Sequence, residues 1–385
     1  MLARVAALDR KITELQLDGY AQYAASSQDA NLYYLTNFLA DDPFLFLRSA
    51  KQSVLVVSSM EKARAVRSAI ADCVRSREDV ITDSPKTGED QATLVTIASV
   101  LKEYEIHRLA VNADFPLGLA DDLRKGGFEI RPISGLIETL RSVKTARELR
   151  LMVEVQRVSE RALASVLAIL THSKVVGDTL RCEGRPLTSE RLKSVIGCSL
   201  IKDGCTSNNV IASSGDDSAL PHLTGSGLVT ANSAIVFDIF PQSVTSRYHA
   251  DLSRTVLRGD ASSELSEMYA AVQEAQNLAF ELLRPGISGA EVHFAVTDYF
   301  EQSGFHTDLE SGQGFIHSVG HGLGLDVHEL PFLSKRGGLL EKGSVVTIEP
   351  GLYYSGIGGV RLEDTAVITH NGNRTITRFP KEFVI

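Results

Sequence analysis

Apolar residues follow two kinds of spacing along the first third of this chain. Short runs of strand length occupy residues 32–35, 44–47, 53–57 and 108–111, and helical spacing covers residues 8–24, 61–74 and 120–125. Alternation of this kind is typical of an α/β domain. We therefore expect an N-terminal α/β domain over residues 1–140, in which no group of charged residues suggests chemistry.

A long amphipathic helix is predicted directly after residue 140. Thr145 and Glu148 stand three residues apart and form a capping box, in which each side chain binds the backbone amide of the other residue. Apolar residues then recur at helical spacing at Leu149, Met152, Val155, Val158, Ala162, Val166 and Ile169. This helix opens a second domain, which we place at residues 141–385.

The second domain mixes helices with paired strands. Helical spacing covers residues 263–283, where Pro285 and Gly286 end it, and residues 288–304, where Ser288 and Glu291 form another capping box. Runs rich in β-branched residues predict strands at 234–240, 249–257, 345–354 and 360–368. Because strands and helices do not alternate strictly, we expect an α+β domain.

Composition excludes several classes of protein. Hydrophobic residues make up 43% of the chain and charged residues 23%, and the formal net charge is −9. An acidic chain without a basic block does not suggest a nucleic-acid partner. No run approaches the roughly 18 apolar residues of a membrane span, and charges interrupt the first twenty residues where a signal peptide would need an apolar core.

The four cysteines are Cys73, Cys182, Cys198 and Cys205, which form no CxxC pair. They are too few for a disulfide framework, so we expect a reducing, cytoplasmic environment. Cys205 is a conceivable nucleophile, but we favour a buried structural thiol.

Four carboxylates stand within or beside apolar strands: Asp238, Asp251, Glu349 and Glu363. A charge in such a place is costly unless something compensates it. Each acid alone could be a strand-end carboxylate bonded to turn amides. Here, however, two pairs of acids stand on two pairs of strands, and the four carboxylates would repel one another if they lay close together. Divalent cations would compensate the charge, and four carboxylates exceed what one small cation requires, which points to two metals.

Three histidines accompany a glycine-rich segment, HSVGHGLGLDVHE: His317, His321 and His328. Its glycines at 320, 322 and 324 are expected to let the backbone approach a metal or a substrate. An imidazole among oxygen ligands suits Mn, Co, Zn or Fe better than Mg or Ca. His222 stands in a loop, SALPHLTGS, and is unremarkable by itself.

These motifs together resemble the pita-bread metallopeptidases. The matching segments are SALPH, the two Asp residues followed by LSRT, HSVGHGLGLDVHE, TIEPGLY and GVRLEDT, in an order that resembles the prolidase/aminopeptidase P branch rather than methionine aminopeptidase. NLYYLTNF and RSVKTARELR match more loosely before residue 150. The resemblance implies a creatinase-like α/β domain over residues 1–140 and a pita-bread catalytic domain over residues 141–385.

The resemblance also implies a two-metal site that activates a bridging hydroxide. The implied ligands are Asp238, Asp251, His321, Glu349 and Glu363. Two divalent ions are implied, with manganese preferred and cobalt or zinc as alternatives. Glu349 would also act as general base and acid.

Further roles follow from the same resemblance. His222 and His328 would bind the scissile carbonyl, His317 would line the pocket for the residue on the proline side, and Arg361 would orient carboxylates or contact the substrate. The implied reaction is hydrolysis of the peptide bond preceding proline, by an Xaa-Pro dipeptidase or an Xaa-Pro aminopeptidase. The implied partners are a peptide substrate and a second copy in a homodimer, with no nucleic acid and no membrane.

The chain departs from the family pattern in three places. Ile239 and Phe240 follow Asp238 where a glycine is usual, the two Asp residues are farther apart than is usual, and Ser253 replaces a threonine. The first two changes fall between the ligands and affect the pocket rim more than the metals, and the third is mild. Two alternatives remain: a creatinase-like hydrolase without metal, and a binding module. Relatives of both kinds lack the complete acidic set that this chain retains.

Overall fold

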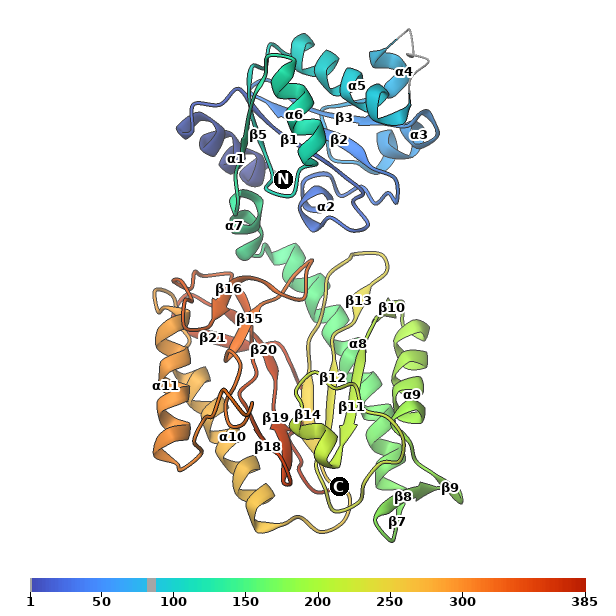
Figure 1. Ribbon diagram of the computed structural model, residues 1–385, viewed down its shortest axis with the longest axis vertical. Coiled ribbons are helices and arrows are strands. Elements are labelled where there is room, and N and C mark those ends of the chain that lie inside the picture. The colour runs from blue at the N-terminus through green and yellow to red at the C-terminus, as the bar shows by residue number, and fades with distance from the viewer. Residues whose placement is uncertain (1, 82–87) are drawn as a thin grey trace. The chain divides into compact units, whose positions relative to one another are not determined.

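The computed structural model describes residues 2–81 and 88–385, and the chain forms two compact units, Met1–Arg141 and Ser142–Ile385 (Figure 1). The sequence placed the boundary at about residue 140. Each unit has a hydrophobic core of its own. None of the helices in the described ranges combines the length and the hydropathy that a bilayer span requires.

The first unit is built on a six-stranded sheet with the order β4-β3-β2-β1-β5-β6. Its strands are β1 (Gly19–Ala24), β2 (Phe44–Ser49), β3 (Ser53–Val57), β4 (Cys73–Ser76), β5 (Arg108–Val111) and β6 (Glu129–Pro132). Its helices are α1 (Leu2–Glu14), α2 (Ala30–Thr36), α3 (Ser59–Ser68), α4 (Arg77–Val80), α5 (Glu89–Glu103), α6 (Leu117–Lys125) and α7 (Leu136–Ser142). Strands β2 and β3 are antiparallel, whereas β5 and β6 are parallel. Helix α5 packs its apolar face into the core of this unit. The expected α/β class is confirmed.

Most of the strands predicted for this unit are confirmed, but three predictions were wrong. Residues 32–35 form part of α2 and not a strand, because the Asp29 side chain accepts a hydrogen bond from the amide of Leu32 and starts a helix there. A short apolar run cannot be told from a buried helix by periodicity alone. The helices predicted at 8–24 and 61–74 end earlier, and the chain continues as β1 and β4.

The second unit places two sheets between pairs of helices (Figure 1). The three-stranded sheet β11-β12-β14 lies beside α8 and α9, and the five-stranded sheet β16-β15-β17-β20-β21 lies beside α10 and α11. Its helices are α8 (Ala146–Thr171), α9 (Ser189–Lys202), α10 (Ser263–Leu282) and α11 (Gly289–Gln302), with a 3-10 turn at Gly215–Ala219. The sheet strands are β11 (Val210–Ser214), β12 (Ile235–Ile239), β14 (Ser253–Val256), β15 (Gly320–Gly322), β16 (Glu329–Leu333), β17 (Val345–Ile348), β20 (Asp364–Ile368) and β21 (Asn373–Thr375). The expected α+β class is confirmed.

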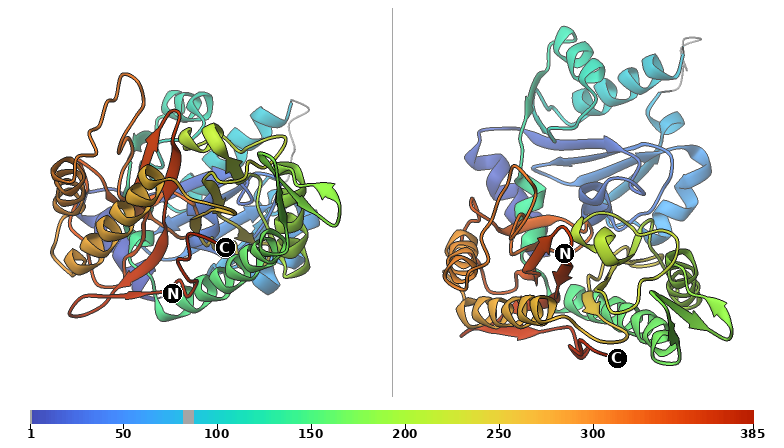
Figure 2. Two further views of the ribbon diagram at one scale, coloured as in Figure 1. Left: turned by 90° about the horizontal axis from the view of Figure 1, so that it is seen from below. Right: turned by 60° about the horizontal axis from the view of Figure 1, so that its bottom comes forward.

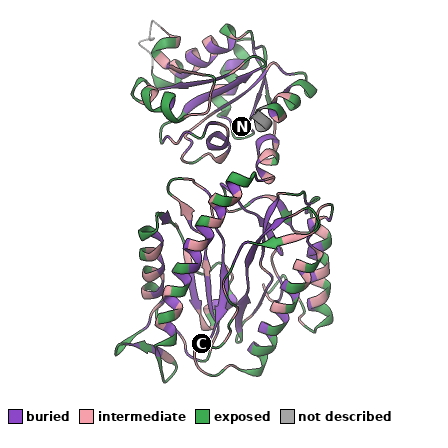
Figure 3. Cartoon of the chain, turned by 180° about the vertical axis from the view of Figure 1, so that it is seen from behind, coloured by how far each residue is buried: buried purple, intermediate pink, exposed green. Residues whose placement is uncertain are grey.

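Shorter strand pairs complete this unit. They are β7 (Lys174–Val176), β8 (Thr179–Cys182) and β9 (Arg185–Pro186), then β10 (Cys205–Thr206) with β13 (Gln242–Ser243), and the hairpin β18 (Gly351–Tyr354) with β19 (Gly358–Arg361). The meander β7-β8-β9 extends outward beyond α9 (Figure 2). Figure 3 shows that the strands of the two larger sheets are mostly buried, whereas the helices expose one side.

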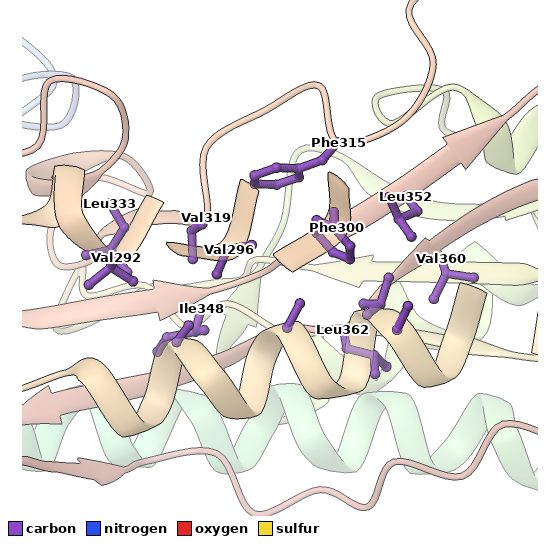
Figure 4. Close-up of a cluster of buried hydrophobic side chains, with 14 of the residues drawn as sticks. Val292, Val296, Phe300, Phe315, Val319, Leu333, Ile348, Leu352, Val360 and Leu362 are labelled. Atoms are coloured by element: carbon purple, nitrogen blue, oxygen red, sulfur yellow. The ribbon is translucent and has the colours of Figure 1, made fainter. Parts of the chain in front are cut away.

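Both predicted capping boxes are present. The Thr145 and Glu148 side chains each bond to the other residue's backbone amide at the start of α8, and Ser288 and Glu291 do the same at the start of α11. The apolar face of α8 is buried, and α11 packs against the five-stranded sheet, as Figure 4 shows. Figure 4 labels Val292, Val296, Phe300, Phe315, Val319, Leu333, Ile348, Leu352, Val360 and Leu362 in this core.

The strands predicted at 345–354 and 360–368 were wrong as single strands. Each run divides into two strands of different sheets, β17 then β18 and β19 then β20. At the first break the amide of Glu349 donates to the carbonyl of Val319, and at the second the amide of Glu363 donates to the carbonyl of Ser253. Pairing with other segments therefore ends each ladder at an acid, which leaves two carboxylates at strand ends inside the unit.

All four cysteines are free thiols. Cys205 is buried, and burial raises the pKa of its thiol, with the Asp203 charge adding to the shift. A raised thiol pKa lowers the fraction of the reactive thiolate. These properties favour the structural thiol expected from the sequence over a nucleophile.

Candidate functional site

Two strands of the three-stranded sheet carry the first pair of acids. Asp238 lies on β12, and Asp251 precedes β14 by two residues. The two strands are antiparallel, and Asp238 stands opposite Ser253 in the register. Asp238 therefore lies beside the start of the strand that Asp251 precedes.

A second set of residues reaches the same place from the five-stranded sheet. Asp251, His321 and Glu363 are buried, and each offers a ligand atom within 4.8 Å of the others. Nε2 of His321 lies 3.2 Å from Oε1 of Glu349 and 3.7 Å from Oδ2 of Asp251. Residues from both sheets thus converge on one buried cluster.

The backbone fixes which nitrogen of His321 faces this cluster. Its amide donates to the Thr347 hydroxyl at 3.1 Å, and Nδ1 of the ring donates to the Gly322 carbonyl at 3.1 Å. A proton held on Nδ1 leaves Nε2 as the nitrogen available for a metal ion.

The electrostatics of the cluster show a deficit of positive charge. Burial raises the pKa of Glu363 well above its usual value, and repulsion from Glu349 and Asp238 adds to it. Burial and the Glu363 charge do the same to the pKa of Asp251. Burial disfavours the charged form of His321 and so lowers its pKa. The hydrogen bond with Glu349 and the negative charge of Glu349 outweigh burial and raise the His321 pKa to about 9. The hydrogen bond and positive charge of His321 likewise outweigh the burial of Glu349 and lower the Glu349 pKa to about 2.

Two buried carboxylate oxygens of this cluster have no hydrogen-bond partner among the described residues. They are Oδ1 of Asp238 and Oε1 of Glu363. Leaving a buried charged acceptor unpaired costs roughly 1–3 kcal/mol or more. Divalent cations would satisfy these oxygens, and the donor set of carboxylates with one imidazole fits Mn, Co or Zn. The residues present therefore fit the two metal ions that the sequence implied.

Arg361 on β19 holds Asp238 from the other side. Its Nη2 donates to Oδ2 of Asp238 at 2.7 Å, and its Nε donates to the hydroxyl of Ser253 at 3.1 Å. The same hydroxyl donates to Oε2 of Glu363 at 3.0 Å. Ser253, one of the departures from the family pattern, thus connects the arginine to a carboxylate of the cluster.

Tyr353 on β18 belongs to this network, and sequence reasoning missed it. Its hydroxyl accepts from Nη1 of Arg361 at 2.9 Å and lies 2.9 Å from Nε2 of His317. Nδ1 of His317 in turn donates to the carbonyl of Ser318 at 2.8 Å. An aromatic hydroxyl inside an apolar strand needs a buried partner, and that signal could have identified Tyr353.

Replacing Tyr353 with Phe will weaken this network. Arg361 loses a buried acceptor, so we expect about 1–3 kcal/mol less stability and a kcat/KM about tenfold lower, as for other residues that orient metal ligands. Thermal melting and peptide hydrolysis measure both. Tyr354→Phe, whose hydroxyl bonds to the His306 carbonyl away from the cluster, is the control; equal effects of the two changes would contradict the assignment.

The three other histidines expected at the site differ in their exposure. His328 meets His321 edge to face, with ring centroids 4.3 Å apart. His222 and His328 are exposed, and His317 is half-buried. Burial lowers the pKa of both His317 and His328, and the neighbouring His222 adds to each shift. The charge of His222 thus acts on both other histidines, and the roles that the resemblance implies for all three stay predictions.

The glycines of the HSVGHGLG segment lie very close to neighbouring parts of the chain. A Cβ at Gly320 would lie 2.0 Å from the carbonyl oxygen of Thr347, and one at Gly322 would lie 2.3 Å from that of Leu330. A Cβ at Gly324 would meet the Glu329 carboxylate. Gly320 and Gly322 therefore let β15 lie close to its neighbouring strands, and the approach of this backbone to a metal or a substrate stays a prediction.

Replacing Gly320 with Ala will therefore destabilise the protein. The added methyl group would clash with backbone atoms, which cannot move aside as the end of a flexible side chain can. We therefore expect the free energy of unfolding to fall by about 3 kcal/mol. Gly338→Ala, where a Cβ would meet nothing within 4 Å, should change stability by less than about 0.5 kcal/mol. Chemical denaturation of both variants measures this, and equal stabilities would contradict it.

The segment that carries this cluster has counterparts in known proteins. A model of metallopeptidase family M24 matches residues 150–370, more than half of the chain. The chain belongs to metallopeptidase family M24. The creatinase/prolidase N-terminal domain matches residues 4–143 of this M24 protein. The expected combination of a creatinase-like domain with a pita-bread catalytic domain is confirmed.

Individual relatives of this M24 protein include peptidases of both kinds left open by the sequence. It is 35% identical over 262 residues to the uncharacterized peptidase YqhT of Bacillus subtilis, covering 67% of this chain and 68% of the relative. The Xaa-Pro dipeptidase structure from Bacillus anthracis matches with a TM-score of 0.83 and 27% identity over 100% of this chain and 99% of that chain. An X-Pro aminopeptidase structure from Thermotoga maritima matches with a TM-score of 0.79 and 25% identity, covering 99% of each chain.

Proposed function

We propose that this M24 peptidase hydrolyses the peptide bond preceding proline, as an Xaa-Pro dipeptidase or Xaa-Pro aminopeptidase that depends on two metal ions. The observation that supports this most is the buried group of Asp251, His321 and Glu363, with Glu349 beside His321 and with unpaired oxygens on Asp238 and Glu363. Such a cluster is costly in a protein unless cations occupy it. The proline preference is supported by the names of the relatives.

Five residues would hold the ions: Asp238, Asp251, His321, Glu349 and Glu363. We propose manganese as the native metal, with cobalt or zinc as substitutes. When bound, the ions lower the pKa of water and polarise the scissile carbonyl. Arg361 and Ser253 would keep two of the carboxylates turned toward the ions through the hydrogen bonds described above.

The other steps fall to side chains of the chain itself. Glu349 would accept the proton of the attacking water and pass it to the leaving amine, because its carboxylate is ionised and lies at the edge of the cluster. His222 and His328, which are exposed beside the cluster, would donate to the carbonyl oxygen as charge develops on it. His317, held by Tyr353 and Ser318, would line the pocket for the proline-side residue.

The test is hydrolysis by protein stripped with a chelator and reloaded with Mn, Co or Zn. Ala-Pro and Ala-Pro-Ala serve as substrates. Hydrolysis of Ala-Pro alone means a dipeptidase, and hydrolysis of the longer peptide means an aminopeptidase. Hydrolysis that needs no metal would favour the creatinase-like alternative, and no hydrolysis of either peptide would favour the binding module.

Two further predictions accompany this proposal. A cytoplasmic location is consistent with four free thiols, and fractionation of cells measures it. A homodimer stays a prediction by analogy, which light scattering of the purified protein tests.

A further inference from the structure

An ion pair lies buried inside the second unit. Nζ of Lys144 donates to Oε1 of Glu329 at 2.6 Å, and the two side chains are only 1% and 4% exposed. Lys144 belongs to the segment RSVKTARELR, and Glu329 ends the segment HSVGHGLGLDVHE. The sequence singled out both segments, but the proposed function gives neither of these two residues a part.

Stability alone does not account for such a pair. Removing two charges from water is costly, and apolar side chains of similar volume are often at least as stable in the same place. A buried pair does restrict geometry, because the ammonium and the carboxylate must stay within hydrogen-bond distance of each other. The pair is therefore understood best from what it holds in place.

The Lys144 end of the pair is anchored by the backbone on both sides. The amide of Lys144 donates to the carbonyl of Gly343 at 2.9 Å, and Val143 forms an isolated β-bridge with Ser344. Thr145, the next residue, caps α8. The ammonium therefore extends from a backbone position that neighbouring segments fix.

The Glu329 end of the pair begins β16, whose own ladder is short. This strand lies at the edge of the five-stranded sheet, where backbone groups have a neighbouring strand on one side alone. Its register with β15 pairs Gly320 with Leu333 and Gly322 with Glu329, and the register is irregular between these two pairs. The side chain of Glu329 therefore supplies a large part of what fixes the start of the strand.

The Glu329 carboxylate also shapes the turn that leads into β16. Its Oε2 accepts from the amide of Asp326 at 3.4 Å, and a Cβ at Gly324 would lie 2.3 Å from its Oε1. The amide of Gly324 donates to the carbonyl of Asp326 at 3.1 Å. Lys144 thus holds a carboxylate against which residues 324–329 are folded.

The residue directly before Glu329 is His328. Its ring meets the ring of His321 edge to face, with centroids 4.3 Å apart. His321 is fixed by its own bonds to Thr347 and Gly322. The distance between the two rings therefore depends on where β16 begins, and a shift of Glu329 moves His328 with it.

We propose that the Lys144–Glu329 ion pair positions His328 for the reaction by fixing the start of β16. Both members are positioning residues, which act through His328 and not on the substrate. The proposal rests on the proposed function, in which His328 donates to the carbonyl oxygen as charge develops on it. Because that hydrogen bond strengthens in the transition state, loss of the pair lowers kcat and leaves KM nearly unchanged.

The test replaces both charges together, so that neither is left alone in the interior. Lys144→Met/Glu329→Met keeps a similar side-chain volume, and its fold should survive. With whichever of Ala-Pro and Ala-Pro-Ala is hydrolysed, we expect kcat to fall at least about tenfold while KM stays within about twofold. Arg48→Met, which removes an ion pair with Asp9 in the first unit, is the control and should lower Tm without changing kcat.

A double-mutant cycle connects the effect to His328. In a His328→Ala background, the same two replacements should change kcat by less than about twofold, because the group that they misplace is gone. A pair that served only the stability of the unit would lower kcat by the same factor in both backgrounds. That result would overturn the proposal.

A spectroscopic measurement makes the result independent of catalysis. NMR of histidine labelled at Cε1, in zinc-loaded and in chelated protein, should show a nuclear Overhauser effect between the rings of His321 and His328. We expect this signal to be lost in Lys144→Met/Glu329→Met and kept in Arg48→Met. If the protein hydrolyses neither peptide but the signal changes in this way, the proposed function fails and the positioning stands. If Xaa-Pro peptides are hydrolysed but either kcat or the signal is unchanged in the double variant, the positioning fails alone.

Discussion

Replacing Glu349 with Gln will reduce kcat about 10²- to 10⁴-fold, the range that general acid–base catalysis supplies. The amide has nearly the same shape as the carboxylate, but it cannot accept a proton from water. In the structure, Oε1 of Glu349 lies 3.2 Å from Nε2 of His321 and accepts from the Thr347 hydroxyl at 3.4 Å. An amide oxygen can keep both contacts, so the fold should remain intact.

The measurement is steady-state hydrolysis of Ala-Pro in the manganese-loaded protein, with thermal melting and metal content determined on the same sample. Glu341→Gln makes the same change at an exposed position outside the cluster and is the control. We expect that control to retain full activity. Wild-type kcat in the Glu349→Gln variant, at full metal content, would remove Glu349 from the mechanism.

Replacing Glu363 with Gln will have opposite effects on the metal-free and the metal-loaded protein. Its side chain is buried with an unpaired oxygen, and repulsion raises its pKa. A carboxyl with a raised folded-state pKa loses stability as pH rises through that value, because burying the ionised form is then costly. Gln stays neutral, so in chelated protein at pH 8 we expect Tm to rise by about 2–4 °C, the shift that roughly 1 kcal/mol produces in a unit of this size.

The same change should lower metal affinity at least about 100-fold, since it removes a ligand and not merely a residue that orients one. Calorimetric titration with manganese measures the affinity, and melting at pH 5 and pH 8 in chelator measures the stability gain, which should be larger at pH 8. Glu310→Gln, at an exposed position, is the control for both. Unchanged manganese affinity, or a chelated variant less stable than wild type at pH 8, would show that this acid is not part of a repulsive metal-binding cluster.

Local signals explain which predictions the structure confirmed. The capping boxes at Thr145 and Ser288 involve residues only three apart, so tertiary contacts could not move them. The strands at 53–57 and 108–111 are short β-branched or apolar runs between turns, and both are present. The acids in apolar strands were conspicuous because an isolated buried charge is so costly.

One wrong prediction concerned a local feature: the run 32–35 is a helix because Asp29 caps it three residues before Leu32, while its apolar pattern suits either element equally. Other features depended on contacts distant in sequence. Glu349 and Glu363 end their strands because their amides bond to carbonyls of Val319 and Ser253, which no periodicity reveals. Tyr353 joined the site only through partners on other segments, Arg361 and His317.

The sequence by itself determined that this chain needs compensation for four acids among apolar strands, since residue type and hydrophobic context are local properties. It also determined the α/β and α+β classes, which follow from the order of apolar periods. Only the tertiary structure decided that Asp251, His321 and Glu363 share one buried centre, and that Gly320 and Gly322 let strands pack closely. Convergence of side chains depends on register and on loop closure between distant segments, and these are set by the packing of the whole unit and not by any one segment.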